Sequence, residues 1–159
     1  MSVVEEVLAA NERYAAAFDR GGLPAPPARR FAVVTCMDAR LDPARFLGLE
    51  EGDAHVIRNA GGIVNDDAIR SLVISHHLLG TQEALVIGHR GCGMTSFTNA
   101  DLRERLGPAA EGIDFGPFAD VAERVRESVE AIRRTPLLPD SFGATGFVYD
   151  VETGRLERV

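Results

Sequence analysis

The feature that most constrains the fold of this chain is an alternation of short apolar runs with segments of helical periodicity. Helical patterns lie at 68–79, which is apolar nearly all round, and at 117–134. A shorter helix is expected where Asp42 provides a cap and Pro43 follows it. The runs expected to form buried strands are 31–35, 54–58, 84–88 and 146–151. Strands that alternate with helices favour an α/β domain around a mainly parallel sheet.

The two ends of the chain add to this scheme. Residues 152–154 can turn the fourth strand into a short antiparallel fifth at the sheet edge. Residues 1–22 predict a helical arm, in which Ser2 and Glu5 form a capping box. Residues 23–30 contain three prolines and form a stiff connector. A helix detached in this way lies either across a partner subunit or on its own domain, and the sequence leaves both arrangements open.

Charge and hydropathy exclude several classes of partner. The chain has 17 Lys and Arg against 24 Asp and Glu, so its net charge of -7 disfavours nucleic acid and anionic membrane surfaces. No apolar run approaches the roughly 20 residues that a membrane span needs. The N-terminal residues are acidic early and do not build an export signal. We therefore expect a cytoplasmic protein whose two cysteines are reduced.

Both cysteines and one histidine directly follow predicted strands. Cys36 comes after the first strand, and His89 and Cys92 come after the third. In open α/β sheets, ligands bind beyond the carboxyl ends of the strands. Thiolate and imidazole groups suit Zn²⁺, and three protein ligands leave a fourth position open, which is typical of a catalytic site. Each cysteine taken alone is more often a small core residue, so spacing by itself leaves both interpretations open.

Asp38 and Arg40 favour the catalytic interpretation. Alternate residues of an extended segment share a face, so Cys36, Asp38 and Arg40 are expected to point toward one site. An arginine can hold a carboxylate through two hydrogen bonds and keep it ionised. A carboxylate held beside a metal can accept the hydrogen bond of a bound hydroxide. The alternative is a surface ion pair without a role in chemistry.

These motifs together resemble the beta-class carbonic anhydrases. The resemblance is carried by Cys36-x-Asp38-x-Arg40 and by His89-x-x-Cys92-Gly93, and it extends through 33–93. It includes the run Arg58-Asn59-Ala60-Gly61-Gly62. One departure is Arg90, where many members of the family have a small or neutral polar residue. A cation at this position either alters the field of the site or points to solvent.

The resemblance implies a fold, an activity and an assembly. The fold is a central, mainly parallel four-stranded sheet with an added antiparallel edge strand, flanked by helices. The activity is reversible hydration of carbon dioxide to bicarbonate and a proton by zinc-bound hydroxide, within a single catalytic domain of residues 1–159. The assembly is a homodimer or a dimer of dimers, in which the N-terminal helix embraces the neighbour. The implied site consists of one Zn²⁺ on Cys36, His89 and Cys92, a dyad of Asp38 and Arg40, and a substrate loop at Gly61 and Gly62.

Three other functions compete with carbon dioxide hydration. Some proteins similar to this one hydrolyse carbonyl sulfide or carbon disulfide with the same five residues. A non-catalytic zinc module would have its fourth metal position permanently filled. A thiol-redox protein is disfavoured because no Cys-x-x-Cys motif is present and the two cysteines are far apart in sequence.

Overall fold

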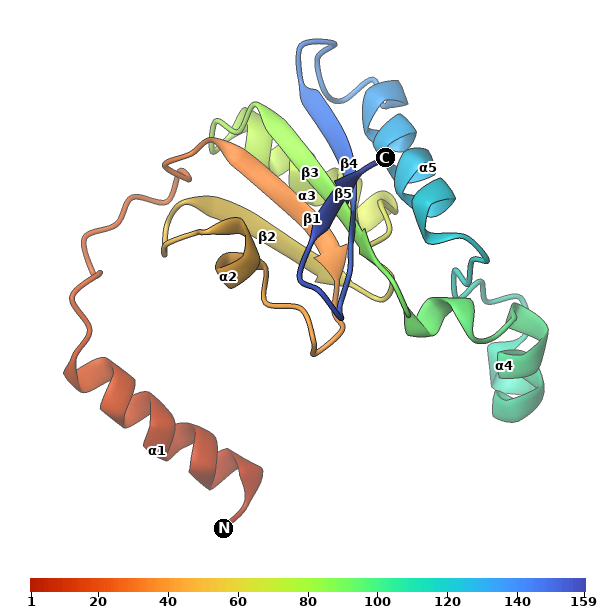
Figure 1. Cartoon of the computed structure of the whole chain (residues 1–159), viewed down its shortest axis with the longest axis horizontal. Helices are drawn as coiled ribbons and strands as arrows, with labels where there is room; N and C mark the ends of the chain where they lie inside the picture. Colours follow the sequence, from red (N-terminus) through yellow and green to blue (C-terminus); the bar gives the residue numbers. More distant parts are fainter.

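The computed structural model describes all 159 residues and is built around one sheet of five strands (Figure 1). The strand order is β2-β1-β3-β4-β5. The first four strands pair in parallel, and β5 pairs antiparallel with β4. This confirms the predicted fold class. The strands are β1 (Phe31–Cys36), β2 (Ala54–Asn59), β3 (Glu83–His89), β4 (Gly143–Tyr149) and β5 (Leu156–Arg158).

Five α-helices and two short 3₁₀ helices connect and flank the strands. Each α-helix begins with a side chain that accepts a hydrogen bond from a main-chain N–H of the first turn, as predicted for Ser2 and Asp42. The helices are α1 (Val3–Ala16), α2 (Pro43–Leu47), α3 (Asp66–His77), α4 (Asn99–Leu106) and α5 (Val121–Arg134). The 3₁₀ helices are η1 (Gly93–Thr95) and η2 (Pro108–Ala110).

The core lies on both faces of the sheet, with β1 at its centre. All six residues of β1 are buried, because the strand is paired on both sides and covered on both faces. On one face, Val34 and Val86 join a large cluster with α3 and α5; on the other, Val33 and Ile87 pack against α2 and the C-terminal strands. Strand β1 therefore holds its last residue, Cys36, in a rigid position.

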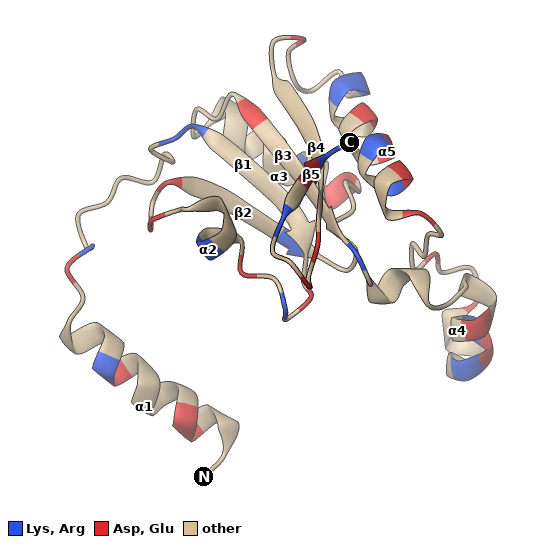
Figure 2. Ribbon diagram, in the orientation of Figure 1, with Lys and Arg blue, Asp and Glu red and all other residues tan.

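Three helices differ from their predicted form. Helix α5 begins four positions later than predicted, because Asp120 caps it. Helix α3 begins two positions earlier than the predicted segment 68–79, because Asn65 caps it, and within the single chain its fully buried residues are Ala68, Leu72 and Ser75. Helix α4 lies in a segment for which the sequence predicted no element. Figure 2 shows acidic and basic residues intermixed along α4 and α5.

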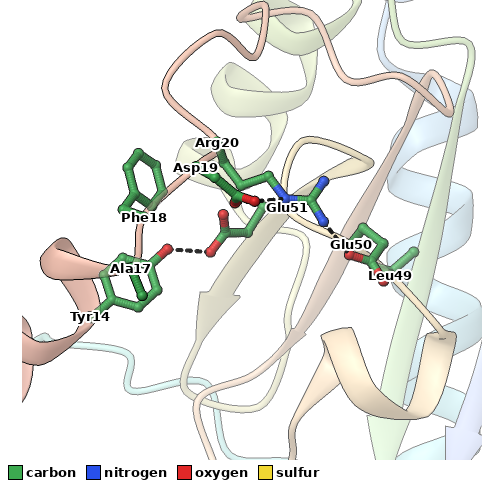
Figure 3. A pocket seen from close by; sticks show the side chains of 8 residues that line it. All are labelled: Tyr14, Ala17, Phe18, Asp19, Arg20, Leu49, Glu50 and Glu51. Carbon is green, nitrogen blue, oxygen red and sulfur yellow. Dashed lines mark hydrogen bonds and ion pairs between the residues drawn. The ribbon is translucent and has the colours of Figure 1, made fainter.

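Helix α1 extends away from the sheet and buries none of its residues (Figure 1). Contacts with the rest of the chain occur where the arm ends. The Tyr14 hydroxyl donates to Glu51, and Arg20 pairs with Glu50 at 3.0 Å (Figure 3). The apolar side chains of α1 thus have no cover within their own chain. None of the helices combines the length and apolar character that a membrane crossing requires.

Candidate metal centre

The strand order places the predicted metal ligands at one point of the sheet. After β1 the chain adds β2 on one side and later β3 on the other, so the order reverses between β1 and β3. Ligand sites of open α/β sheets lie beyond the carboxyl ends of the strands at such a reversal. Cys36 is the last residue of β1, His89 is the last residue of β3, and Cys92 lies in the following turn.

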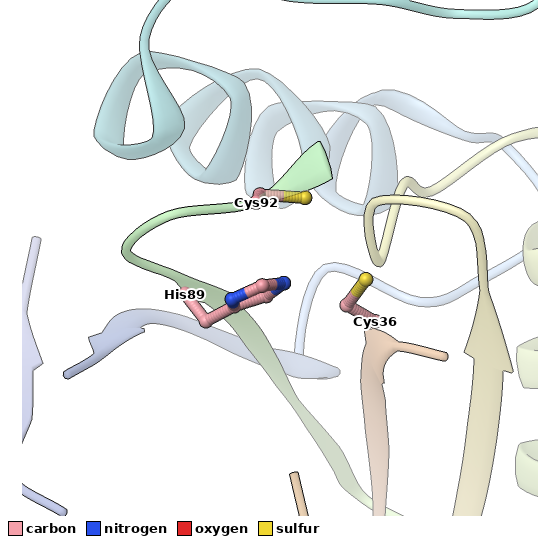
Figure 4. Close-up of side chains that lie close together, drawn as sticks. All are labelled: Cys36, His89 and Cys92. Atoms are coloured by element: carbon pink, nitrogen blue, oxygen red, sulfur yellow. The ribbon is translucent and has the colours of Figure 1, made fainter. Parts of the chain in front are cut away.

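The three side chains converge and are buried (Figure 4). Their ligand atoms all lie within 4.8 Å of one another. A tetrahedral zinc ion with Zn–S bonds of about 2.3 Å separates its sulfurs by about 3.8 Å, so little movement is needed. His89 Nδ1 lies 3.0 Å from the main-chain oxygen of Arg90, which fixes the proton on Nδ1. His89 Nε2 is buried without a hydrogen-bond partner and is free to bind a metal.

The electrostatics of the three residues also suit a cation. The pKa of Cys36 is lowered to about 4, first by the neighbouring Cys92 thiol and then by His89 and nearby main-chain groups. The pKa of Cys92 is raised, because its proton is held by the Cys36 thiolate. Burial opposes the charged form of His89, yet the adjacent Cys36 sulfur and the main-chain oxygen of Arg90 raise its pKa. The metal-free site therefore concentrates negative charge on sulfur, and the residues present fit a zinc ion.

Asp38 and Arg40 form a close pair beside these ligands. Arg40 donates from Nε to Asp38 Oδ1 at 3.0 Å and from Nη2 to Oδ2 at 2.7 Å. Arg40 also donates to the main-chain oxygen of Gly91 at 2.9 Å, which links the pair to the turn before Cys92. These bonds hold the pKa of Asp38 well below its usual range. Asp38 Oδ2 lies 3.7 Å from His89 Nε2, so the carboxylate faces the metal position.

The local backbone at this pair differs from the predicted one. The expected extended segment ends at Cys36, and the main-chain N–H of Leu41 donates to the oxygen of Asp38 at 3.0 Å. Residues 38–41 thus form a β-turn, whose first side chain accepts a hydrogen bond from the N–H of Arg40. Asp38 and Arg40 lie close together because of this turn and not because alternate residues of a strand share a face.

Gly61 and Gly62 lie against the end of β1. Both have positive φ angles, +87° and +63°. A Cβ atom on Gly62 would lie 2.8 Å from the nitrogen of Cys36 and 2.8 Å from the carbonyl carbon of Thr35. The glycine therefore allows the turn after β2 to approach the backbone that carries the first metal ligand. Their role in substrate binding stays a prediction.

We expect Gly62→Ala to destabilise the protein by about 2–4 kcal/mol, from the left-handed backbone and the steric contact together. Thermal unfolding of the metal-free protein measures this effect, and zinc retention should fall as Cys36 is displaced. Gly22→Ala is the matched control, because nothing lies within 4 Å of the added atom and its φ is not positive. Equal melting temperatures for the two variants would contradict the close-approach argument.

Arg58 is a functional residue to which the sequence motif gave no role. It donates from Nε to the oxygen of Cys36 at 2.9 Å and from Nη2 to the oxygen of Asp38 at 2.8 Å. One guanidinium group thus fixes the main chain on both sides of Met37. The sequence places Arg58 at the end of the predicted strand 54–58, but its register partner, Thr35, is seen only in the structure.

The position of Arg90 settles one question that the sequence left open. Its side chain pairs with Glu157 at 3.1 Å and lies 3.9 Å from Asp150, both in the hairpin of β4 and β5. The cation therefore points to the hairpin and not into the site. The main-chain oxygen of Arg90 contacts the site instead, because it accepts the hydrogen bond of His89 Nδ1.

Comparisons with known proteins agree with this geometry. The family model described as carbonic anhydrase matches residues 31–115. Beta-carbonic anhydrase 1 of Mycobacterium tuberculosis is 46% identical over 163 residues, covering 100% of this chain and 99% of the relative. Carbon disulfide hydrolase of an Acidianus species is 36% identical over 160 residues, covering 84% and 78%.

The structural comparison covers the whole chain as well. The crystal structure of a carbonic anhydrase from Streptococcus mutans superposes with a TM-score of 0.95 and 46% sequence identity, over 100% of this chain and 98% of that one. The family model, the sequence comparison and the fold comparison agree over the segment that carries all seven predicted site residues. The chain therefore belongs to the beta class of the carbonic anhydrase family.

Proposed function

We propose that this protein catalyses the reversible, zinc-dependent hydration of carbon dioxide to bicarbonate and a proton. The observation that carries the proposal is the convergence of Cys36, His89 and Cys92 at the β1–β3 reversal, with the free Nε2 of His89. The full-length similarity to beta-carbonic anhydrase 1 supports the choice of substrate. The assigned roles are zinc ligation for these three residues and positioning of the nucleophile for Asp38 and Arg40.

The metal and the Asp38–Arg40 dyad would contribute different parts of the reaction. Zinc supplies hydroxide near neutral pH, because it lowers the pKa of water from 15.7 to about 7. The carboxylate of Asp38 faces the metal position and would serve there as a hydrogen-bond acceptor that orients the attacking oxygen. Arg40 fixes the rotamer of Asp38 through two hydrogen bonds. Because both Asp38 oxygens accept hydrogen bonds from Arg40, the carboxylate is held beside the three residues that would bind zinc.

Charge balance in this site differs from that of a site with three histidines. Two thiolates cancel the charge of Zn²⁺, and Arg40 cancels that of Asp38. A neutral centre is a weaker acid than a dicationic one, so activity is expected to increase above neutral pH. Both members of the dyad are partly exposed, with 16% of the Asp38 side chain and 52% of the Arg40 side chain accessible.

A second candidate is hydrolysis of carbon disulfide or carbonyl sulfide, which the 36% identical carbon disulfide hydrolase favours. The decisive experiment measures zinc content, stopped-flow hydration of carbon dioxide and release of hydrogen sulfide on the same preparation. We expect one zinc per chain and rapid carbon dioxide hydration without comparable sulfide release. Faster sulfide release would favour the second candidate, and full zinc content without either reaction would favour a non-catalytic zinc module.

We also propose that the protein is a homodimer or a dimer of dimers, in which the arm of residues 1–22 lies on a second copy. Helix α1 supports this, because large apolar side chains gather on it without cover: Val3, Val4, Val7 and Leu8 are 59–75% exposed. Monomeric proteins rarely expose such a contiguous apolar surface. Residues 23–30 connect the arm to the remainder, and we treat 1–159 as one catalytic unit. A cytoplasmic location suits the two thiols, which a reducing compartment keeps available for metal.

The arm proposal predicts the effect of charged substitutions. The double variant Val4→Asp and Leu8→Asp is expected to elute as a monomer, because two buried carboxylates oppose the interface. Light scattering should give twice the 17.1 kDa chain mass or more for the parent and a single chain mass for the variant. Arg13→Asp is the control, since position 13 lies on the face of the helix opposite position 4. A parent protein that elutes as a monomer would contradict the proposal.

A further inference from the structure

The turn of residues 89–92 carries two of the three proposed metal ligands and contains a glycine between them. The imidazole of His89 is oriented through its Nδ1, which lies 3.0 Å from the main-chain oxygen of Arg90. This oxygen belongs to the peptide that joins Arg90 to Gly91, whose φ is +64°. Glycine adopts positive and negative φ with similar ease, so the turn alone does not fix the direction of this carbonyl. Contacts from outside the turn are needed to fix it.

Two main-chain contacts hold the turn on either side of this carbonyl. Arg40 donates from Nη2 to the oxygen of Gly91 at 2.9 Å. The main-chain N–H of Arg90 donates to the oxygen of Tyr149 at 2.9 Å, so β4 stays bound to the chain one residue beyond the end of β3. Neither contact bonds to the Arg90 carbonyl itself, which can therefore still rotate between them.

The side chain of Arg90 supplies a third contact, to the hairpin of β4 and β5. Its Nη2 donates to Glu157 Oε2 at 3.1 Å, and its Nε lies 3.9 Å from Asp150 Oδ2. Asp150 follows β4 directly, and its Oδ1 accepts the main-chain N–H groups of Glu152 at 2.8 Å and Thr153 at 3.3 Å. Glu157 lies in β5. One guanidinium group thus ties Arg90 to both sides of the hairpin.

We propose that Arg90 is a positioning residue whose side chain, through Glu157 and Asp150, keeps its own main-chain oxygen on His89 Nδ1 and thereby keeps His89 Nε2 directed at the metal position. This inference rests on the proposed zinc ligation by His89. Without the guanidinium group, the Arg90 peptide is free to rotate at Gly91. The imidazole then loses the partner that fixes its proton and its orientation, and the metal is held less firmly.

The test uses the full chain loaded with Zn²⁺ or Co²⁺. For Arg90→Ala we expect zinc transfer to a chromogenic chelator to be about fivefold faster, the upper range for exposed ion pairs, since 62% of the Arg90 side chain is accessible. The visible ligand-field bands of the Co²⁺ form should broaden, because the imidazole no longer has a single orientation. The difference in zinc transfer should shrink at about 1 M salt, which screens exposed pairs.

Two further variants separate the pairing from the loss of a side chain. Arg90→Lys keeps the charge but not the planar fork that reaches both carboxylates, so it should lie between the parent and Arg90→Ala. Glu157→Gln should speed zinc transfer in the parent and add nothing in the Arg90→Ala background, because the two residues act as one pair. Fully additive effects of the two substitutions would overturn the proposal.

Arg155→Ala is the matched control. Arg155 lines the same surface hollow as Arg90 but pairs with neither carboxylate, so its removal changes the charge and leaves the turn in place. Equal zinc transfer rates and equal Co²⁺ spectra for Arg90→Ala and Arg155→Ala would overturn the proposal, because Arg90 would then act only through its charge. Neither measurement needs turnover. A protein that binds zinc, shows both changes and does not hydrate carbon dioxide would contradict the proposed function and leave this inference standing, whereas a parent that binds no zinc would overturn both.

Discussion

Replacement of Cys36 or Cys92 by serine is expected to remove both bound zinc and activity. A hydroxyl is a far poorer zinc ligand than a thiolate, because it is not ionised at neutral pH. Structural zinc sites with four ligands bind with about 10–16 kcal/mol, so the loss of one ligand costs about 3 kcal/mol, or roughly a hundredfold in affinity. Elemental analysis after dialysis, together with stopped-flow carbon dioxide hydration, measures both losses.

Met37→Leu is the control for this experiment. Met37 is the neighbour of Cys36 but is 66% exposed, so its replacement should leave zinc content unchanged. The cysteine variants should also retain the far-ultraviolet dichroism of the parent, because serine fills nearly the same volume in a core built by other residues. One zinc per chain in either cysteine variant would show that the assignment of metal ligands is wrong.

The second large effect is expected for Arg40→Ala, which should retain zinc and lose turnover by about a hundredfold, the lower range for a positioned proton-transfer group. An aspartate of ordinary pKa, about 3.9, is already ionised at neutral pH, so the charge of Asp38 does not depend on Arg40. What Arg40 supplies is the fixed direction of the carboxylate. The loss should therefore appear in kcat, with full metal content.

The Asp38–Arg40 pair also makes the free energy of unfolding depend on pH in the acid range. The folded pKa of Asp38 lies below its value in the unfolded chain, so the pair stabilises the protein above about pH 3.9, and this contribution fades as the pH falls toward the folded pKa. Arg40→Ala should lose the contribution at neutral pH. Arg45→Ala, an exposed arginine on α2, is the control and should change neither kcat nor this pH dependence. Unchanged turnover in Arg40→Ala would show that the dyad is not needed.

The strands and the ligand positions could be predicted from the sequence because they depend on local patterns. Each apolar run had the length of a strand, and the rule that ligands bind at strand ends selected Cys36, His89 and Cys92. The strand order, with β1 between β2 and β3, is what converts these separate positions into one site. The long separation of Cys36 and Cys92 in sequence, used against redox pairing, said nothing about their distance in space.

The remainder depended on contacts that a single sequence does not display. The pairing of Asp38 with Arg40 was predicted, but it arises from a β-turn that the apolar pattern did not reveal. Arg58 acts through main-chain oxygens, which have no sequence signature. Segment 93–116, with α4, has too few apolar residues at helical spacing to predict its path. The exposure of α1 could not be predicted either, since a stripe of apolar residues does not reveal which surface covers it.

The placement of the ligands on two central strands has a consequence for the energetics of the whole chain. A metal ion bound by Cys36, His89 and Cys92 would add a link between the ends of the paired strands β1 and β3 and the turn after β3. Zinc that binds the folded chain more tightly than the unfolded one adds RT ln(1 + [Zn]/Kd) to the free energy of unfolding. The fraction of molecules that are folded therefore rises with the concentration of free zinc. A low zinc concentration would lower the free energy of unfolding through this one site.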